Sequence, residues 1–416
     1  MLAVLRQRNY VLLWSAGALS MIGDWVLLIA LPYYVYELTG SAMATGAMFM
    51  VYNVPRVLFA PLGGVFADRW DRKRLMVVSD VSLAILLLLM LVMTSAGNLW
   101  FVYVFAFAQA GIGQFFFPAR SALIPRLVGK ERLVAANSLD TLTMGLVRLI
   151  GPSVGGLLMA LFGLASAIFV DVASFLVSAV LTALIVVPRG SVDERAEFDD
   201  QAALAIWTRV WQDVLAGVRL IRRERVVTAV LSGAGLTMIG YGMVTVLLVV
   251  FARAVLDGGA AVYGWLAAAQ GLGTLIGGMV IGQLGKLLPP GRFLPLSLVG
   301  VGFALLVTFN ATTLLLVLAF IGLAGAFLAG SMVGERTLLQ SSVADEYRGR
   351  VFGGYSTITS LLILVGVGSA SVLAGPLGVV LTLTIASGLY VLAGAITLVM
   401  LSRVRAPGQP SVEAAI

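Results

Sequence analysis

Twelve long apolar stretches constrain the fold of this chain more than any other feature of its sequence. Each is continuous and about 20 residues long, the length that a helix needs to cross the hydrocarbon core of a bilayer. A β-barrel would show short segments of alternating polarity instead. The sequence therefore predicts an all-α integral membrane protein with twelve transmembrane helices. The expected spans are 10–36, 43–66, 76–95, 99–122, 134–161, 165–187, 227–251, 261–285, 293–309, 313–336, 352–374 and 377–401.

A polar stretch in the middle of the chain divides these spans into two sets of six. We expect an N-terminal six-helix bundle at 1–187, a cytoplasmic linker at 188–225, a C-terminal six-helix bundle at 226–402 and a disordered tail at 403–416. Within the linker, apolar residues recur at helical spacing among arginines. They predict either a helix lying on the cytoplasmic membrane surface or a solvated linker helix.

The basic residues indicate how the helices are oriented. Loops after the odd-numbered spans of the N-terminal set contain no Lys or Arg, and Arg253 is the one such residue in the corresponding loops of the second set. This bias predicts that the protein lies in the cell (inner) membrane with both termini and the central loop on the cytoplasmic side. The net charge of +7 is spread over short loops and does not indicate nucleic-acid binding.

The composition excludes most catalytic chemistry. Charged residues make up 11% of the chain, and it contains neither Cys nor His. We find no convergent nucleophile, base or metal cluster, so we expect no enzyme, no cofactor and no metal site. A channel would usually show rings of polar or charged groups. The intramembrane charges here are asymmetric, which favours a carrier.

A charged loop follows the second apolar stretch and reads Gly-Gly-Val-Phe-Ala-Asp-Arg-Trp-Asp-Arg-Lys-Arg-Leu, from Gly63 to Leu75. It can be a basic loop that only orients the helices. It can also be a conformational latch, in which the glycines let a neighbouring helix approach and an acid caps the adjoining element. The proposed latch consists of Gly64, Asp68, Arg69, Arg72 and Lys73.

This loop resembles the signature between helices two and three of the major facilitator superfamily, with Asp71 where the family pattern has Gly. The resemblance implies a twelve-helix secondary transporter that works by alternating access. It also implies that Asp68 contacts the start of helix eleven in the outward-open state.

The two halves of the chain look like repeats of one unit. Gly278 follows Gly64 by 214 residues in a similar context, and Val343 follows Val128 by 215. Two matches at nearly one offset favour duplication of a six-helix unit, as in parallel-repeat transporters.

Three charges fall near mid-membrane, at Asp24, Arg56 and Arg148. Each such charge costs about 2.5–3.5 kcal/mol on insertion scales. We hypothesise that Asp24 is the protonatable site and that Arg56 or Arg148 tunes it. The alternative is a permanent ion pair that only fixes helix packing.

Four other charged residues lie nearer the ends of spans. For Asp171, in the outer third of the sixth span, and for Asp140, near the cytoplasmic end of the fifth, the alternatives are a second relay and an ordinary interfacial charge, and we favour the interfacial charge. The adjacent Glu335 and Arg336 are interpreted as part of an inner gate or as simple anchoring.

The fifth span carries Gly151, Pro152, Gly155 and Gly156, which resemble the antiporter signature of drug–proton exporters in the superfamily. Many members carry an Arg in the fourth span, and Ala106 stands at that position here. The resemblance therefore implies that proton coupling does not run through that Arg.

The segments 116–121 and 345–352 resemble the branch that includes macrolide-efflux and enterobactin-exporter proteins. In the second half, apolar, aromatic and Met side chains predict a cavity for bulky amphipathic ligands. Its candidate lining is Met238, Tyr241, Met243, Gln270, Tyr355 and Ser360.

These features together predict a monomeric secondary transporter that exports hydrophobic or amphipathic compounds, of multidrug or macrolide type, in exchange for protons. Its partners would be the substrate, protons and the lipid bilayer. The alternative is an exporter of a siderophore or a lysophospholipid flippase, because two mid-membrane arginines against one acid favour an anionic ligand.

Overall fold

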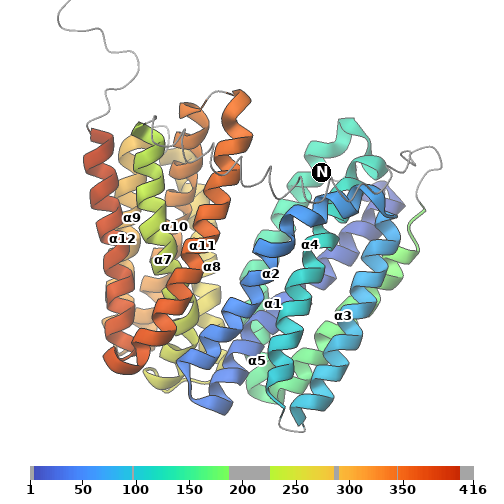
Figure 1. The fold of residues 1–416 in the computed structure, drawn as a ribbon, viewed down its shortest axis with the longest axis horizontal. Coiled ribbons are helices and arrows are strands. Elements are labelled where there is room, and N and C mark those ends of the chain that lie inside the picture. Colours follow the sequence, from blue (N-terminus) through green and yellow to red (C-terminus); the bar gives the residue numbers. More distant parts are fainter. Residues whose placement is uncertain (1–3, 96–97, 187–224, 285–289, 344, 403–416) are drawn as a thin grey trace, which may run out of the picture. The chain divides into compact units, whose positions relative to one another are not determined.

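The computed structural model describes residues 4–95, 98–186, 225–284, 290–343 and 345–402 of the 416. The expected disordered tail and all of the linker except residue 225 lie outside these residues. Between them, the described segments contain helices and no strand (Figure 1). The elements are η1 (Val4–Arg6), α1 (Arg8–Thr39), α2 (Ala42–Arg69), α3 (Arg72–Ser95), α4 (Trp100–Val128), η2 (Lys130–Arg132), α5 (Leu133–Ala183), α7 (Arg225–Ala254), α8 (Ala260–Leu284), α9 (Pro290–Asn310), α10 (Leu314–Ser342), α11 (Asp345–Leu377) and α12 (Val379–Ser402).

The prediction of an all-α membrane protein is confirmed. Among the described residues, ten helices are long and apolar enough to cross a membrane. Many large apolar side chains on these helices are exposed, among them Leu315 at 79% and Met279 at 74%. A water-facing surface would be charged, so this apolar exterior suits lipid contact. The count of twelve spans in two bundles stays a prediction.

The α5 element spans 51 residues but contains two helices. Gly163 interrupts it with φ 72° and ψ −175°, a left-handed φ that favours glycine. Asn9 donates to the carbonyl of Val186 at 2.8 Å, and Tyr10 donates to that of Ala136 at 3.1 Å. Both ends of the element therefore lie beside the start of α1, so the chain doubles back at Gly163, between the predicted spans 134–161 and 165–187.

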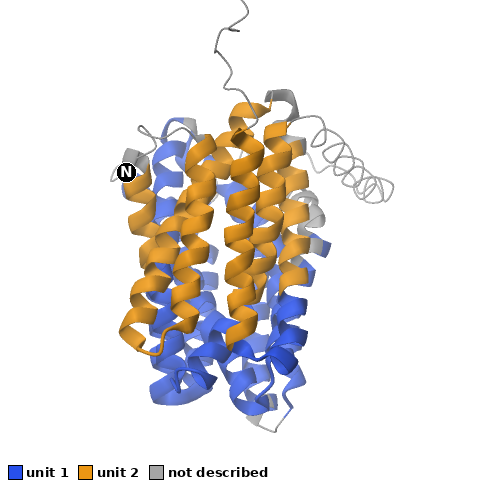
Figure 2. Ribbon diagram, turned by 90° about the vertical axis from the view of Figure 1, so that its left-hand side faces the viewer, with its two compact units in different colours: residues 1–210, 245–271, 367–379 blue, residues 211–244, 272–366, 380–416 orange. Residues whose placement is uncertain are grey.

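The chain forms two compact units, coloured separately in Figure 2. Unit 1 contains residues 1–210, 245–271 and 367–379, so it includes α1 to α5, the end of α7, the start of α8 and the end of α11. Unit 2 contains residues 211–244, 272–366 and 380–416. The predicted boundaries at 187 and 226 concern the order of helices along the chain and stay a prediction.

Within unit 1, α1 packs along α5, α2 packs with α4, and α3 packs with both α4 and α5. Buried side chains from all five helices form one apolar cluster that includes Leu27, Leu87 and Phe105. Within unit 2, α9 packs along α10, and Leu298 and Leu339 share another cluster. Each unit therefore has its own packed interior.

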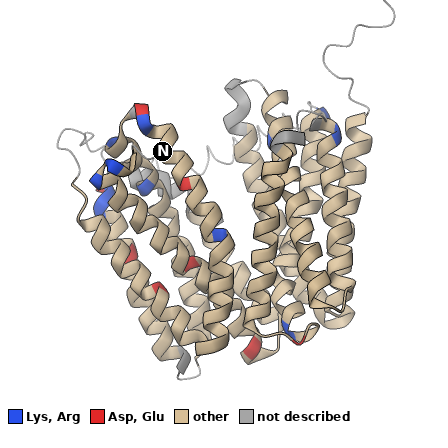
Figure 3. Ribbon diagram, turned by 180° about the vertical axis from the view of Figure 1, so that it is seen from behind, with Lys and Arg blue, Asp and Glu red and all other residues tan. Residues whose placement is uncertain are grey.

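Basic residues gather at one end of unit 1. Arg8 begins α1, Arg72 begins α3, Arg126 lies in the last turn of α4, and Arg132 precedes α5. In Figure 3, the blue that marks Lys and Arg is concentrated in unit 1 at the end that carries the N-terminus. We call this end the basic end. The sequence predicts that it faces the cytoplasm.

The close approach of α1 and α5 depends on glycines, which have no side chain, and this dependence can be tested. A Cβ on Gly155 would lie 2.7 Å from the carbonyl oxygen and 2.9 Å from the Cα of Val26. Gly155→Ala should push two backbones apart and lower the unfolding free energy by about 1–3 kcal/mol. The measurement is thermal unfolding of the purified protein in detergent.

Gly113→Ala is the matched control, because its Cβ would meet only the ring edge of Phe117, at 3.8 Å. Alanine favours a helix interior by about 1 kcal/mol over glycine, so this variant should be neutral or stabilised. Equal melting temperatures for the two variants would contradict the close-approach argument.

Candidate functional site

A small recess in unit 1 holds one carboxylate among apolar and aromatic side chains. Asp24 of α1 lies in it, and Gln109 of α4 donates from Nε2 to Asp24 Oδ1 at 2.7 Å. Gln109 is buried, which makes this a fixed contact between the two helices. The remaining walls come from α1, α2 and α4. They are Leu27, Leu28, Leu31, Met48, Phe49, Tyr52 and Ala106.

The glycines of the predicted antiporter-like motif place α5 against α1 beside this recess. A Cβ on Gly151 would lie 2.5 Å from the Cβ of Trp25, and Gly155 faces the backbone of Val26. Both neighbours directly follow Asp24 in the chain. The motif therefore fixes the helix segment that carries the carboxylate.

Gly156, on another side of the same helix, faces α8. A Cβ there would lie 2.6 Å from the carbonyl oxygen of Ala260 and 3.0 Å from the Cα of Gly264. A Cβ on Gly264 would in turn lie 2.5 Å from the carbonyl oxygen of Pro152. The motif thus joins α5 to two helices, α1 on one side and α8 on the other.

The structure brings Arg148 close to the segment that carries Asp24. Its guanidinium carbon lies 5.8 Å from the centre of the Trp25 ring, within the range of a cation–π contact. Arg148 is exposed. The side chain of Arg56 lies outside the part of α2 whose side chains are described. The proposed tuning of Asp24 by Arg56 or Arg148 stays a prediction.

Two further carboxyls, neither of which we predicted to be buried, lie in the interior of unit 1. Asp171 is 0% exposed, so its interpretation as an interfacial charge is wrong. Asp80 of α3, which we did not single out, is 1% exposed and accepts a 2.6 Å hydrogen bond from Ser178 Oγ. Ser174 Oγ donates to Asp171 Oδ1 at 2.9 Å.

The spacing of polar residues in the sixth predicted span could have revealed that Asp171 is buried. Asp171, Ser174, Ser178 and Thr182 follow one another at steps of three, four and four residues. Such spacing puts four polar side chains on one face of an otherwise apolar helix. A polar stripe inside a membrane span indicates a partner within the protein.

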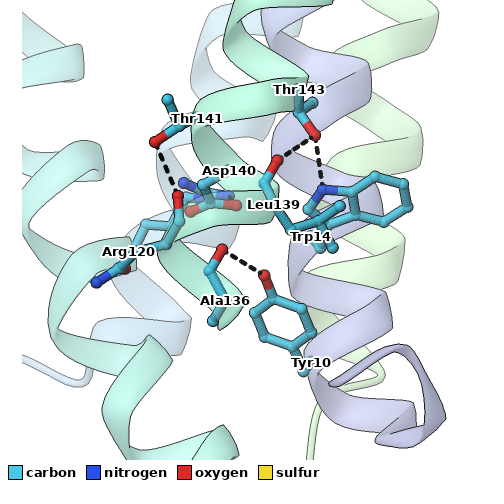
Figure 4. A network of polar contacts seen from close by, with 9 residues as sticks. Tyr10, Trp14, Arg120, Ala136, Leu139, Asp140, Thr141 and Thr143 are labelled. Atoms are coloured by element: carbon cyan, nitrogen blue, oxygen red, sulfur yellow. Dashed lines mark hydrogen bonds and ion pairs between the residues drawn. The ribbon is translucent and has the colours of Figure 1, made fainter. Parts of the chain in front are cut away.

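Asp140 lies at the basic end in an ion pair rather than as an isolated interfacial charge. Arg120 Nη2 lies 2.9 Å from Asp140 Oδ1, and both side chains are largely buried. Figure 4 shows this pair beside Tyr10 and Trp14 of α1. Trp14 Nε1 donates to Thr143 Oγ1 at 2.9 Å. These contacts tie α1, α4 and α5 together near the basic end.

The proposed latch is described only in part, because the side chains at 60–69 lie outside the described set. Arg72 Nη1 donates to the carbonyl of Ala122 at 3.4 Å, and Lys73 Nζ donates to that of Ile185 at 2.8 Å. These two contacts tie the start of α3 to α4 and to the end of α5. The role of Gly64, Asp68 and Arg69 in a latch stays a prediction.

The predicted lining of the second half falls in both compact units. Met238, Tyr241 and Tyr355 belong to unit 2, whereas Gln270 belongs to unit 1. Tyr355 donates from its hydroxyl to Glu335 Oε2 at 2.6 Å. Glu335 is buried, and its neighbour Arg336 is exposed, so the two residues do not act as one surface anchor.

The end of unit 1 opposite to the basic end carries an ion pair between helices from the two halves of the sequence. Arg253 of α7 donates from Nε to Glu37 Oε2 of α1 at 3.0 Å. Arg253 also lies 3.3 Å from Asp257. Nearby, a Cβ on Gly46 of α2 would overlap the hydroxyl of Ser371 of α11.

Comparison with known proteins agrees with this architecture. The family model described as "Transmembrane secretion effector" matches residues 1–413. An MFS-type transporter of Bacillus subtilis, YfiS, is 26% identical over 94% of this chain and 93% of its own. Macrolide efflux protein A of Streptococcus pyogenes is 24% identical over 88% of this chain and 89% of its own.

The fold also matches solved transporters. A crystal structure of a bacterial homologue of the iron transporter ferroportin, in an inward-facing state, has a TM-score of 0.74 at 18% identity. The match covers 96% of this chain and 99% of that one. With its apolar helices and a family match over residues 1–413, this chain belongs to the major facilitator superfamily, as a multi-pass membrane transporter rather than an enzyme.

Proposed function

We propose that this protein exports hydrophobic or amphipathic small molecules of the macrolide type in exchange for protons, by alternating access. The observation that carries the proposal is the Asp24 carboxylate, which shares an apolar recess with the Gln109 amide 2.7 Å away. Export is favoured by the similarity to macrolide efflux protein A. The proposal of proton coupling rests on the Asp24 carboxylate.

The side chains around this small recess suit part of the wall of a path for an apolar ligand with few polar groups. Leucines of α1, Met48 and Phe49 offer dispersion contacts, and Tyr52 adds an aromatic ring with a polar tip. Met and aromatic side chains adapt to ligands of different shape. Such a wall discriminates weakly among bulky compounds, as a multidrug exporter requires.

Asp24 supplies the proton chemistry. An isolated ionised carboxylate in a low-dielectric interior costs several kcal/mol, so the group needs a donor or a proton. Gln109 provides one amide donor, which satisfies one carboxylate oxygen. A helix movement that changes these contacts would change how readily Asp24 holds a proton, and this links protonation to conformation.

The ion pair of Glu37 and Arg253 would serve as a lock on the end of the transporter opposite to the basic end. It joins α1 to α7, where Gly156 packs on Gly264 and Gly46 packs on Ser371. Both charged side chains are about 40% exposed, and solvent-exposed pairs of this kind contribute little to stability. A lock of this strength can open during each transport cycle.

Asp24→Asn tests the coupling role. In proteoliposomes with an imposed pH gradient, uptake of a radiolabelled macrolide should fall to the level of protein-free liposomes, because Asn cannot bind and release the proton. Macrolide counterflow without a gradient should persist, because substrate exchange needs no net proton movement. Loss of both activities would favour a purely structural Asp24, and undiminished gradient-driven uptake would refute the proposal.

Glu131→Gln is the matched control for this experiment. Glu131 is an exposed acid in η2, near the basic end. Its neutralisation removes one negative charge without touching the recess. Both activities should match those of the unmodified protein.

Thiol cross-linking tests the lock. The chain contains no Cys, so Glu37→Cys with Arg253→Cys introduces the only reactive thiols. A short flexible bismaleimide should join them, as measured by mass spectrometry, and transport should stop. The pair Glu131→Cys with Arg253→Cys is predicted to lie at opposite ends and should not react. Full transport by the cross-linked protein would contradict a lock at this contact.

A further inference from the structure

The polar stripe on the second helix of α5 lies wholly inside unit 1, apart from the recess. Its members are Asp171, Ser174, Ser178 and Thr182. Exposure is 0% for three of them and 9% for Ser174. Asp24 and the recess explain none of these buried polar groups, and the substrate walls include none of them. The stripe therefore calls for a separate explanation.

Asp171 lacks the donors that an ionised carboxylate needs. Oδ1 accepts one hydrogen bond from Ser174, and Oδ2 is buried with no hydrogen-bond partner among the described residues. Asp24 and Asp80, both acidic, are close enough to Asp171 to interact with a charge on it. A fully buried carboxylate with one neutral donor and two acidic neighbours is costly, whereas a carboxylic acid is not.

Asp80 contacts the stripe at Ser178, where α3 packs in a regular way along the second helix of α5. Lys73 of α3 contacts Ile185, and Asp80, seven residues later in α3, contacts Ser178, seven residues earlier than Ile185. Seven residues correspond to about 10 Å of helix. Asp80 therefore lies about 10 Å from the basic end, and Thr182 lies between, with a buried hydroxyl that has no partner among the described residues.

Asp171 adjoins the recess through a glycine. A Cβ on Gly23 of α1 would overlap the Asp171 carboxylate and the Ser174 hydroxyl. Gly23 directly precedes Asp24, whose charge acts on both Asp80 and Asp171. The three acids, on α1, α3 and α5, therefore form one electrostatically connected group.

We propose that Asp171 and Asp80 are proton-binding sites, and that with Asp24 they form a relay through the interior of unit 1, between the recess and the basic end. The ligand is a proton, because no cluster of three ligating side chains suited to a metal ion occurs among the described residues. The inference extends the proposed function by adding a proton route separate from the substrate route.

Each transfer in the relay conserves the proton. A carboxylic acid O–H gives its proton to a neighbouring carboxylate or hydroxyl oxygen, and a hydroxyl that receives one proton releases its own to the next oxygen. Ser174 and Ser178 lie one helical turn apart between the two acids and can each donate and accept. Movement of α1 at Gly23 relative to the second helix of α5 would open or close the step between Asp171 and Asp24.

Infrared spectroscopy tests proton occupancy without any transport. Purified protein with ¹³C-labelled aspartate carboxyls should show the C=O stretch of protonated aspartic acid at neutral pH. Asp171→Asn and Asp80→Asn should each remove part of that band, beyond the part lost in Asp24→Asn. An unchanged band in both variants, with folding verified by thermal unfolding, would overturn the proposal.

A variant that keeps all three acids covers the case in which Asp171→Asn does not fold. Ser174→Ala removes the hydroxyl donor of Asp171, and a hydrogen bond to a charged group is worth about one pH unit of titration or more. The pH midpoint of the band should shift by this amount. An unshifted midpoint would show that Asp171 does not titrate and would overturn the relay.

Matched serine variants test the route itself. Ser178 and Ser387 are both 0% exposed, but Ser178 bonds to Asp80, whereas Ser387 bonds to the carbonyl of Leu383 in its own helix. Ser178→Ala should slow gradient-driven macrolide uptake and spare counterflow, and Ser387→Ala should leave both unchanged. Equal uptake rates for the two variants would contradict the route.

The infrared result does not depend on the role of Asp24 in coupling. If Asp24→Asn keeps gradient-driven uptake while the Asp171 band is present, the proposed function fails and the proton sites stand. If Asp24→Asn abolishes uptake and the Asp171 and Asp80 bands are absent, the proposed function stands and the relay fails.

Discussion

The contact between α1 and α5 is the interaction on which the rest of unit 1 depends. It has two parts, both made where side chains are absent: Gly151 and Gly155 of the first helix of α5 face α1, and Gly23 of α1 faces the second helix of α5. In a bilayer, helices gain little from hiding apolar surface, so close backbone contact must supply the association energy. The first part holds Asp24 at the recess, and the second gives Asp171 its space. One packing feature therefore sets the positions of two acids.

The acids deep inside unit 1 follow a different rule from the charged residues near its two ends. At the basic end, Arg120 pairs with Asp140, and at the opposite end Arg253 pairs with Glu37, so each has a partner of opposite sign. In the interior, the hydrogen-bond partners of Asp80 and Asp171 among the described residues are hydroxyl groups. A charge that serves stability needs a counter-ion, whereas a group that binds a proton needs only a neutral neighbour. This contrast separates structural ion pairs from candidate coupling groups.

Sequence reasoning predicted most of the fold because spans of apolar residues are a strong signal. Span 10–36 became α1, and the break between the fifth and sixth spans falls at Gly163. It also singled out Asp24, because an acid deep in a span stands out. It did not anticipate Gln109 as the partner of Asp24, since an amide in a helix gives no signal about which helix it faces. It misjudged Asp171 and passed over Asp80, because distance from a span end says nothing about whether a side chain faces lipid or protein.

The turn at Gly163 has a consequence for how the chain enters the membrane. The two helices of α5 are joined almost without a loop, and Ser166 donates to the carbonyls of Leu158 and Gly163 across the bend. A lone helix carrying Asp171 would partition poorly into lipid. As half of a tight hairpin, it can leave the translocon together with its apolar partner, so biogenesis tolerates an acid that the finished transporter keeps inside.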